Sequence, residues 1–289
     1  MTPPPGPVPA ARALWERLEP VHDVVYFTPE ARAAAEAAGY RGFWRGYFAM
    51  RAAPLGPVGP APVTAAFHNF HPSMPARALP EVWSLAPPAA ALDARSSGAA
   101  AALRRIGTGP VDRAAELAWA AASEVDVEGR VLAAANAALP RPGGAVETLW
   151  QATTTLREHR GDGHVAVLVA RGVGPVAAHL LKAAAGETDA EWLRTARGWS
   201  DDDWATGTED VRRRGWTGPD GTLTSAGAAE HTEIERLTDA AAARPWTALG
   251  GDRTDELAAL LDPLASAVLA AGDVPERSPV GLVRSTGES

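Results

Sequence analysis

The sequence predicts a mainly α-helical protein that carries one short β-hairpin. Apolar residues recur at helical spacing along most of the 289 residues, and alanine-rich stretches alternate with prolines and glycines of the kind that begin and end helices. Only one segment, residues 216–224, has a strong hairpin signal, the turn Pro219-Asp220-Gly221. With 46% hydrophobic and 21% charged residues, the chain can bury a globular core.

A helical N-terminal domain is expected over residues 11–144, after a flexible, proline-rich lead at residues 1–10. Thr28 followed by Pro29 predicts a helix start, because threonine caps a helix N-terminus and proline fits its first turn. The segment LPRPGG is the predicted linker to the second domain. The predicted helices cover residues 11–19, 28–38, 42–53, short pieces between the prolines of 62–83, and alanine-rich pieces of 86–130.

A second domain is expected over residues 145–275, followed by a flexible tail at residues 276–289. Ser200 with Asp203 has the spacing of a capping box, which predicts a helix start. The last predicted helix carries leucines and valines at i, i+3, i+4 and i+7, a stripe that suits either packing or homodimer formation. The predicted helices cover residues 146–172, 175–185, 189–197, 200–214, 226–243 and 254–271.

Composition excludes several functional classes. The chain has 27 basic and 35 acidic residues and a net charge of −8, which argues against a surface built wholesale for nucleic acid or anionic membrane. It has no cysteine, so disulfides, thiolate metal sites and a cysteine nucleophile are excluded. The sequence shows no hydrophobic signal core and no apolar run long enough for a bilayer, so a cytoplasmic protein without a membrane partner is expected.

Standard enzyme motifs are also missing from the sequence. It contains no dinucleotide-binding glycine motif after a strand, no phosphate-binding P-loop and no nucleophile elbow of the hydrolase type. Nucleotide-dependent chemistry is therefore not expected, and no cofactor is predicted.

The order of helices, hairpin and long helix over residues 146–271 resembles the winged helix of MarR-type regulators. The segments that carry this resemblance are LLKAAAG, the two capped helices after it, RRRGWTGPDGTLTSAG and HTEIERLTDAAAARPWTALG. Leu223, Thr224 and Gly227 stand where that family's wing leads into its dimerisation helix. The whole chain also resembles an uncharacterised family of actinobacterial helix-turn-helix proteins, in the strings HDVVYFTPEAR, FHNFHP, HRGDGH and RGWS.

The MarR-type resemblance implies a recognition helix that begins at Ser200 and enters the major groove of DNA. Asp201 to Asp203 stand at its leading end, where each carboxylate would repel phosphate. Arg212, Arg213 and Arg214 stand at its far end and could contact phosphates through the wing. Nucleic acid is therefore a possible but disfavoured partner.

The HRGDGH segment combines two glycines with ionisable side chains inside a predicted helix. Glycine is unfavourable in a helix interior, and such exceptions often occur at functional or tightly packed sites. Three interpretations stay open. The segment forms a buried polar cluster that pins the helix to the N-terminal half, or it lines a ligand pocket in which Arg160 holds an anionic group. In the third, His159 or His164 is a general base oriented by Asp162.

Aromatic residues close together on one predicted helix offer a wall for a flat hydrophobic ligand. Trp44, Tyr47 and Phe48 lie on one face at helical spacing, although packing in the core explains them equally well. Further polar candidates for the same pocket are His22, Asn69 and His71. A metal site would require His68, His71, His159 and His164 to converge, and no recognised metal pattern is present, so no metal is predicted.

These observations favour a helical protein that binds a small hydrophobic or aromatic molecule between its two halves. Its role is predicted to be regulatory or sequestering, with DNA binding weak or lost. Two alternatives stay open. One is a DNA-binding transcriptional regulator of the MarR type, and the other is an enzyme with a His/Asp pocket on the same scaffold.

Overall fold

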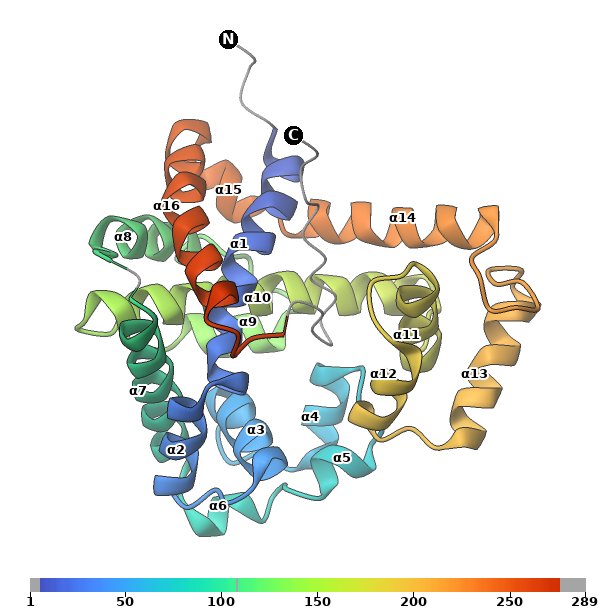
Figure 1. The fold of residues 1–289 in the computed structure, drawn as a ribbon, viewed down its shortest axis with the longest axis horizontal. Helices are drawn as coiled ribbons and strands as arrows, with labels where there is room; N and C mark the ends of the chain where they lie inside the picture. The colour runs from blue at the N-terminus through green and yellow to red at the C-terminus, as the bar shows by residue number, and fades with distance from the viewer. Residues whose placement is uncertain (1–5, 108, 276–289) are drawn as a thin grey trace.

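The computed structural model describes residues 6–107 and 109–275, and throughout these ranges the regular secondary structure is helical (Figure 1). The predicted mainly α class is therefore confirmed. The helices are α1 (Pro7–Phe27), α2 (Pro29–Ala37), α3 (Phe43–Ala52), η1 (Ala53–Leu55), α4 (Pro60–Phe67), α5 (Ser73–Ala76), α6 (Val82–Leu85), α7 (Pro88–Ile106), α8 (Asp112–Ala122), α9 (Val131–Ala137), α10 (Ala145–Ala170), α11 (Pro175–Ala184), α12 (Ala190–Arg197), α13 (Asp201–Arg213), α14 (Ser225–Ala241), α15 (Arg244–Leu249) and α16 (Gly251–Ala270).

The predicted β-hairpin, and with it the MarR-like winged-helix half, is wrong. Between α13 and α14 only one antiparallel bridge forms, from Thr217 to Leu223, and the described residues contain no strand. The reason lies directly after the turn, where the Thr224 hydroxyl accepts a hydrogen bond from the Gly227 N–H at 3.1 Å and caps α14. The chain enters a helix there, so no residues are left to extend a two-stranded ladder.

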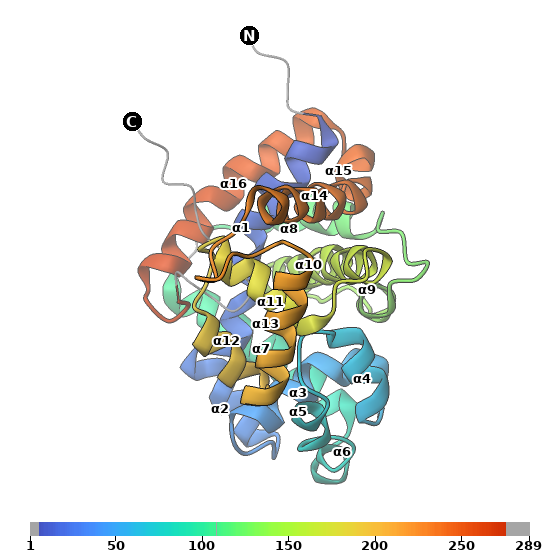
Figure 2. The same ribbon diagram turned by 90° about the vertical axis from the view of Figure 1, so that its right-hand side faces the viewer.

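The main body is built around α10, which runs across the molecule with α1, α7, α8, α9 and α14 packed against it (Figures 1 and 2). Its largest apolar cluster includes Leu14, Leu117, Trp150, Leu257 and Leu261, all at most 1% exposed. This cluster joins residues from both predicted domains. The apolar stripe of α16 is used within the chain, because α16 packs on α1 and α8.

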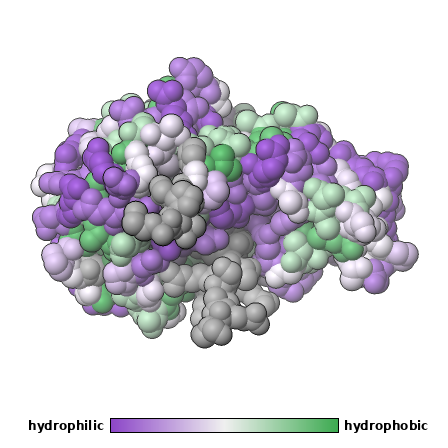
Figure 3. Space-filling view, turned by 90° about the horizontal axis from the view of Figure 1, so that it is seen from above, coloured by the Kyte–Doolittle hydropathy of each residue, from purple (hydrophilic) through white to green (hydrophobic). Residues whose placement is uncertain are grey.

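Helices α11 to α13, the segment that the sequence resemblance assigned to a helix-turn-helix and that is called the helix-turn-helix part below, project from one end of α10 (Figure 1), and α14 contacts α11. A small apolar cluster joins it to the body and includes Leu181 and Val211 of this part, Leu168 of α10 and Ile234 of α14. At Gly207 of α13 an added Cβ would lie 2.3 Å from a methyl group of Val176, so the two helices approach too closely for a side chain. Seen from above, the described surface of the molecule is largely hydrophilic with smaller apolar patches (Figure 3).

Both ends of α1 differ clearly from the predicted ones. Helix α1 begins at Pro7, inside the predicted flexible lead, and continues through Pro20 to Phe27 instead of stopping at the proline. Pro20 is tolerated because the flanking turns are tightly packed: Leu18, Val21 and Val24 are at most 2% exposed. Residues 1–5 of the predicted lead and the whole predicted tail lie outside the described residues.

Among the described residues, no single helix has the length and apolar character needed to cross a membrane. The pair α10 and α11 meets that requirement only when taken together, and the two helices are bent by 104° relative to each other.

Candidate functional site

A cavity of about 350 Å³ lies between the N-terminal helices and the helix-turn-helix part. Helices α1, α3 and α4 form one side of it, and α10, α11, α12 and α14 form the other. The residues that line it are Arg12, Trp15, Glu19, Asp23, Tyr26, Phe27, Phe43, Trp44, Tyr47, Arg51, Ala66, Phe67, Asn69, Phe70, Leu132, Arg157, Glu158, Arg160, Gly161, His164, Val165, Ala178, His179, Lys182, Glu187, Trp192, Ala196, Arg197 and Glu235.

Aromatic rings form one wall of this cavity. The ring of Tyr47 lies 5.0 Å from that of Tyr26, 5.6 Å from that of Phe70 and 5.7 Å from that of Trp44, measured between centroids. Phe48, the next residue on α3, is fully buried behind this wall and does not line the cavity. Such a wall suits flat apolar groups, because aromatic pairs prefer these spacings.

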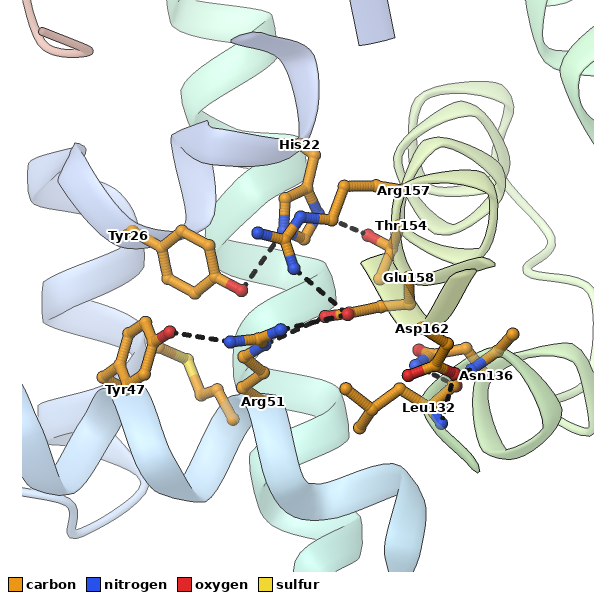
Figure 4. A network of polar contacts seen from close by, with 12 residues as sticks. His22, Tyr26, Tyr47, Arg51, Leu132, Asn136, Thr154, Arg157, Glu158 and Asp162 are labelled. Carbon is orange, nitrogen blue, oxygen red and sulfur yellow. Dashed lines mark hydrogen bonds and ion pairs between the residues drawn. The ribbon is translucent and has the colours of Figure 1, made fainter. Parts of the chain in front are cut away.

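A buried ion-pair cluster centred on Glu158 forms the floor of the cavity (Figure 4). Both carboxylate oxygens of Glu158 accept hydrogen bonds from Arg51, at 3.0 and 3.1 Å, and one also accepts from Arg157 at 3.0 Å. Arg157 in turn donates to Glu19 at 3.1 Å. Burial alone would raise the pKa of Glu158, but the two guanidinium groups hold it below its usual range, so the carboxylate is ionised.

Two groups beside this cluster have unsatisfied polar atoms. Asp23 is 1% exposed, and its Oδ2 has no hydrogen-bond partner among the described residues. Burial, reinforced by the nearby Glu19, raises the pKa of Asp23 well above its usual value. Arg197, 8% exposed, lies 4.3 Å over the Phe70 ring, and its Nε also lacks a partner. Burial lowers its pKa, and no carboxylate of the described residues pairs with it.

Near Trp15, the charged groups that line the cavity are paired with one another. Arg160 donates to Asp239 at 2.7 Å and to Glu235 at 3.4 Å, while its guanidinium lies 4.5 Å over the ring of Trp15. Arg12 pairs with the same two carboxylates. Arg160 therefore already has two anionic partners within the chain, although its Nε has none.

The structure brings five of the predicted ligand-binding residues together around the cavity. These are Trp44, Tyr47, Asn69, Arg160 and His164. The other five lie outside the lining and are His22, Phe48, His71, His159 and Asp162. The prediction that all ten bind one ligand stays a prediction.

Within the HRGDGH segment, the helical geometry of α10 sends neighbouring side chains in different directions. His164 faces the cavity and hydrogen-bonds with Thr238 at 2.9 Å, and burial lowers its pKa to about 3. His159 lies away from the cavity and hydrogen-bonds with Asp126 at 2.8 Å. Asp162 accepts the backbone N–H groups of the first turn of α9, at 2.8 and 2.9 Å, and so anchors that helix.

The remaining histidine candidates have separate surroundings. His22 contacts Thr154 at 3.0 Å and Tyr26 at 3.2 Å beneath the cavity. His71 contacts Ser73 at 2.7 Å near the surface. In the described part of the chain, no three histidine or acidic side chains are grouped so that they could hold a metal ion.

Sequence reasoning missed most of the charged cavity residues. The missed residues that form or adjoin the buried ion-pair cluster are Glu19, Asp23, Arg51, Arg157, Glu158 and Arg197. A signal was available in the N-terminal helix, where Glu19 and Asp23 are four residues apart within an otherwise apolar stretch. Carboxylates at such positions are rarely buried without partners, so their spacing points to a polar site.

The exposed face of α13 is acidic at its N-terminal end. The capping box is present, with Ser200 and Asp203 bonded reciprocally, and the Asp201 side chain is 88% exposed. At the other end, Arg213 and Arg214 both pair with Asp210. Arg212 donates to the Pro219 carbonyl at 2.9 Å. The positive charge available to a phosphate is therefore reduced by contacts within the chain.

The fold and the cavity define a helical protein in which helices α11 and α12 form one side of a partly charged pocket. Residues 11–275 match the model of a helix-turn-helix family, and the chain therefore belongs to that family. This family has the type of fold found in DNA-binding regulators. No curated protein and no solved structure matches the chain significantly.

Proposed function

We propose that this protein binds a small hydrophobic or aromatic molecule in the cavity between its helical body and its helix-turn-helix part. Its role is regulatory or sequestering, and its DNA binding is weak or lost. The observation that carries this proposal is the cavity itself: it has the volume of a small-molecule site, an aromatic wall and a few buried polar groups.

The end of α12 links the cavity to the helix-turn-helix part. The Arg197 carbonyl accepts a hydrogen bond from the His71 N–H at 2.9 Å, and the Trp199 indole donates to the Asn69 carbonyl at 3.1 Å. At Gly198 an added Cβ would lie 2.5 Å from the side chain of Met74. A ligand that contacts α12 from inside the cavity would therefore favour one position of the C-terminal end of α12 relative to the N-terminal helices.

The acidic face of α13 supports weak DNA binding. Asp201, Asp202 and Glu209 are exposed along this helix, so their carboxylates would repel the phosphates of a duplex that approached it. Family membership supports the alternative, a DNA-binding regulator, and the two proposals are separated by experiment.

The test compares a cavity-filling variant with a matched surface variant on the same helix. Gly161 lines the cavity, and an added Cβ there would meet only the Glu158 side chain, at 3.7 Å. Gly161→Leu therefore fills the cavity with little disturbance of α10, whereas Ala166→Leu adds a side chain to the exposed face. Each protein is purified natively and its bound molecules are identified by denaturing mass spectrometry.

We expect an organic molecule to co-purify with the wild type and Ala166→Leu, and to be lost from Gly161→Leu. Equal retention by Gly161→Leu would contradict binding in this cavity. A ligand-free wild type that shifts duplex DNA at moderate salt, and loses this activity when Arg212, Arg213 and Arg214 are replaced by alanine, would favour the DNA-binding regulator instead.

A further inference from the structure

We propose that the ligand of the cavity is an aromatic carboxylate whose carboxylate group is held between Arg197 and Asp23. This inference rests on the proposed function and adds the chemical class of the ligand. Both residues line the cavity, both are more than nine-tenths buried, and both have a polar atom without a partner among the described residues.

Among the described residues of the buried ion-pair cluster and its neighbours, Arg197 is the cation without a carboxylate partner. Arg51 and Arg157 are both satisfied by Glu158, and Arg157 also pairs with Glu19. Burial disfavours the charged form of Arg197, the Tyr47 hydroxyl favours it, and Arg51 and Arg157 oppose it, while no carboxylate of the described residues pairs with Arg197. A buried cation without a counter-ion is costly, and a ligand that supplies one negative charge would remove that cost.

Asp23 can donate a hydrogen bond to the ligand carboxylate that Arg197 binds. The carboxyl of Asp23 lies within electrostatic range of Glu19, Arg157, Arg51 and Arg197, and the raised pKa favours its protonated form. A protonated carboxyl can donate one hydrogen bond to a ligand carboxylate, while the guanidinium donates to the same group. A neutral amide ligand would leave the charge of Arg197 uncompensated.

The aromatic part of the ligand follows from the surroundings of Arg197. Its guanidinium stacks over Phe70, whose ring lies 5.9 Å from that of Trp44 and 5.6 Å from that of Tyr47. A ring attached to the carboxylate would therefore enter this aromatic wall. Phe43 and Trp192, also part of the lining, are 41% and 37% exposed, so the apolar surface continues outward to solvent.

The experiment measures the affinities of matched carboxylates and amides. Benzoate, phenylacetate and 2-naphthoate are each compared with their primary amides by isothermal titration calorimetry against the full chain. Arg197→Gln removes the proposed anion-binding group, and Arg194→Gln is the control on the same helix, since Arg194 lies outside the cavity lining, is partly exposed and pairs with Glu191 and Asp201. Circular dichroism confirms that both variants are folded.

We expect the wild type and Arg194→Gln to bind at least one carboxylate about 10- to 100-fold more tightly than its amide, the range expected for one charged hydrogen-bonded contact. Arg197→Gln should lose this preference. Equal binding of acid and amide by the wild type would overturn the carboxylate inference and leave the proposed function standing. Binding of neither, by a protein that also co-purifies with no molecule, would overturn both.

If Arg197→Gln fails to fold, Asp23→Asn provides the second measurement. This amide can still donate a hydrogen bond but carries no ionisable proton, so it should keep the carboxylate preference within a few-fold. A complete loss of carboxylate binding in folded Asp23→Asn, with amide binding retained, would contradict the proposed role of Asp23 as a hydrogen-bond donor.

Discussion

At the residue scale, the buried carboxylate of Glu158 is the most strongly constrained group in the cavity. It is 2% exposed and accepts hydrogen bonds from two guanidinium groups, Arg51 and Arg157. A buried charge of this kind is stable only while its partners are present, because loss of a partner leaves a poorly solvated charge uncompensated. The cluster is therefore expected to be more sensitive to a single substitution than any ion pair on the surface.

Glu158→Gln is predicted to lower the free energy of unfolding by about 3–5 kcal/mol, because it leaves Arg51 and Arg157 buried without their shared counter-ion. Urea denaturation followed by tryptophan fluorescence measures this change. The control is Glu191→Gln, which breaks an exposed pair with Arg194 and should have no measurable effect. Similar destabilisation in the two variants would contradict the burial argument.

His179 gives a pH dependence with a defined sign. Burial lowers its pKa to about 3, while its Nε2 contacts the Asn69 carbonyl at 2.9 Å. Between that value and the usual pKa near 6.5, the unfolded chain binds the proton and the folded chain does not. Stability is therefore lost as the pH falls below about 6.5. This shift in the pKa of His179 lowers the free energy of unfolding by about 2 kcal/mol at pH 5 relative to pH 7.5.

Urea titrations at pH 7.5 and pH 5 check this prediction. His179→Gln should reduce the loss of stability between the two pH values. His231→Gln is the control of opposite sign, because the hydrogen bond that His231 donates to the Glu187 carboxylate raises the pKa of His231 and favours the folded state at low pH. The His231 variant should lose more stability on acidification than the wild type. An unchanged pH profile in His179→Gln would show that His179 is protonated in the folded protein.

At the element scale, two glycines of α10 have opposite roles although they are two residues apart. At Gly161 an added Cβ meets only an ordinary contact of 3.7 Å with Glu158. At Gly163 it would lie 2.6 Å from Nη1 of Arg130 and 3.2 Å from the Cβ of Ala241 on α14. Arg130 is held there by hydrogen bonds of 2.8 Å to two carbonyls, those of His159 and Ala241.

Alanine at these two positions is predicted to change stability in opposite directions. Gly161→Ala should stabilise the protein by about 0.5–1 kcal/mol, since alanine favours a helix interior more than glycine does. Gly163→Ala should destabilise it by about 1–3 kcal/mol, because the contact between α10 and α14 must open. Urea denaturation measures both. Stabilisation by both substitutions would show that Arg130 and α14 move aside freely.

At the scale of the whole molecule, the main apolar cluster includes helices from both sides of the predicted domain boundary. Leu14 and Leu117 come from the first half, while Trp150, Leu257 and Leu261 come from the second. The predicted division into residues 11–144 and 145–275 stays a prediction, and this core contains residues of both parts.

We predict that a fragment of residues 11–144 does not fold independently. Removing α10 and α16 would expose the apolar faces of α1 and α8 to water, which removes the main source of their stability. Circular dichroism and thermal unfolding of the fragment test this, with the 11–275 fragment as the control. A cooperative thermal transition in the short fragment would establish the first half as a separate domain.

The sequence determined the helical class and most helix starts, because caps, prolines and apolar spacing are local signals. Its resemblance to a helix-turn-helix family could also be recognised from the sequence. Thr28 and Ser200 cap their helices as predicted. The turn at residues 216–224 was also correctly located, but whether strands extend from it depends on where the next helix begins. The sequence also indicated several cavity residues, Trp44, Tyr47, Arg160 and His164 among them.

Only the tertiary structure decided which side chains meet. His159, Asp162 and His164 are neighbours in sequence, yet α10 directs only His164 into the cavity, because successive residues on a helix point about 100° apart. Arg51, Glu158 and Arg197 are brought together from three distant helices, and no local pattern encodes that approach. Burial then sets their ionisation, since the cost of desolvation and the available counter-charges depend on the packed surroundings.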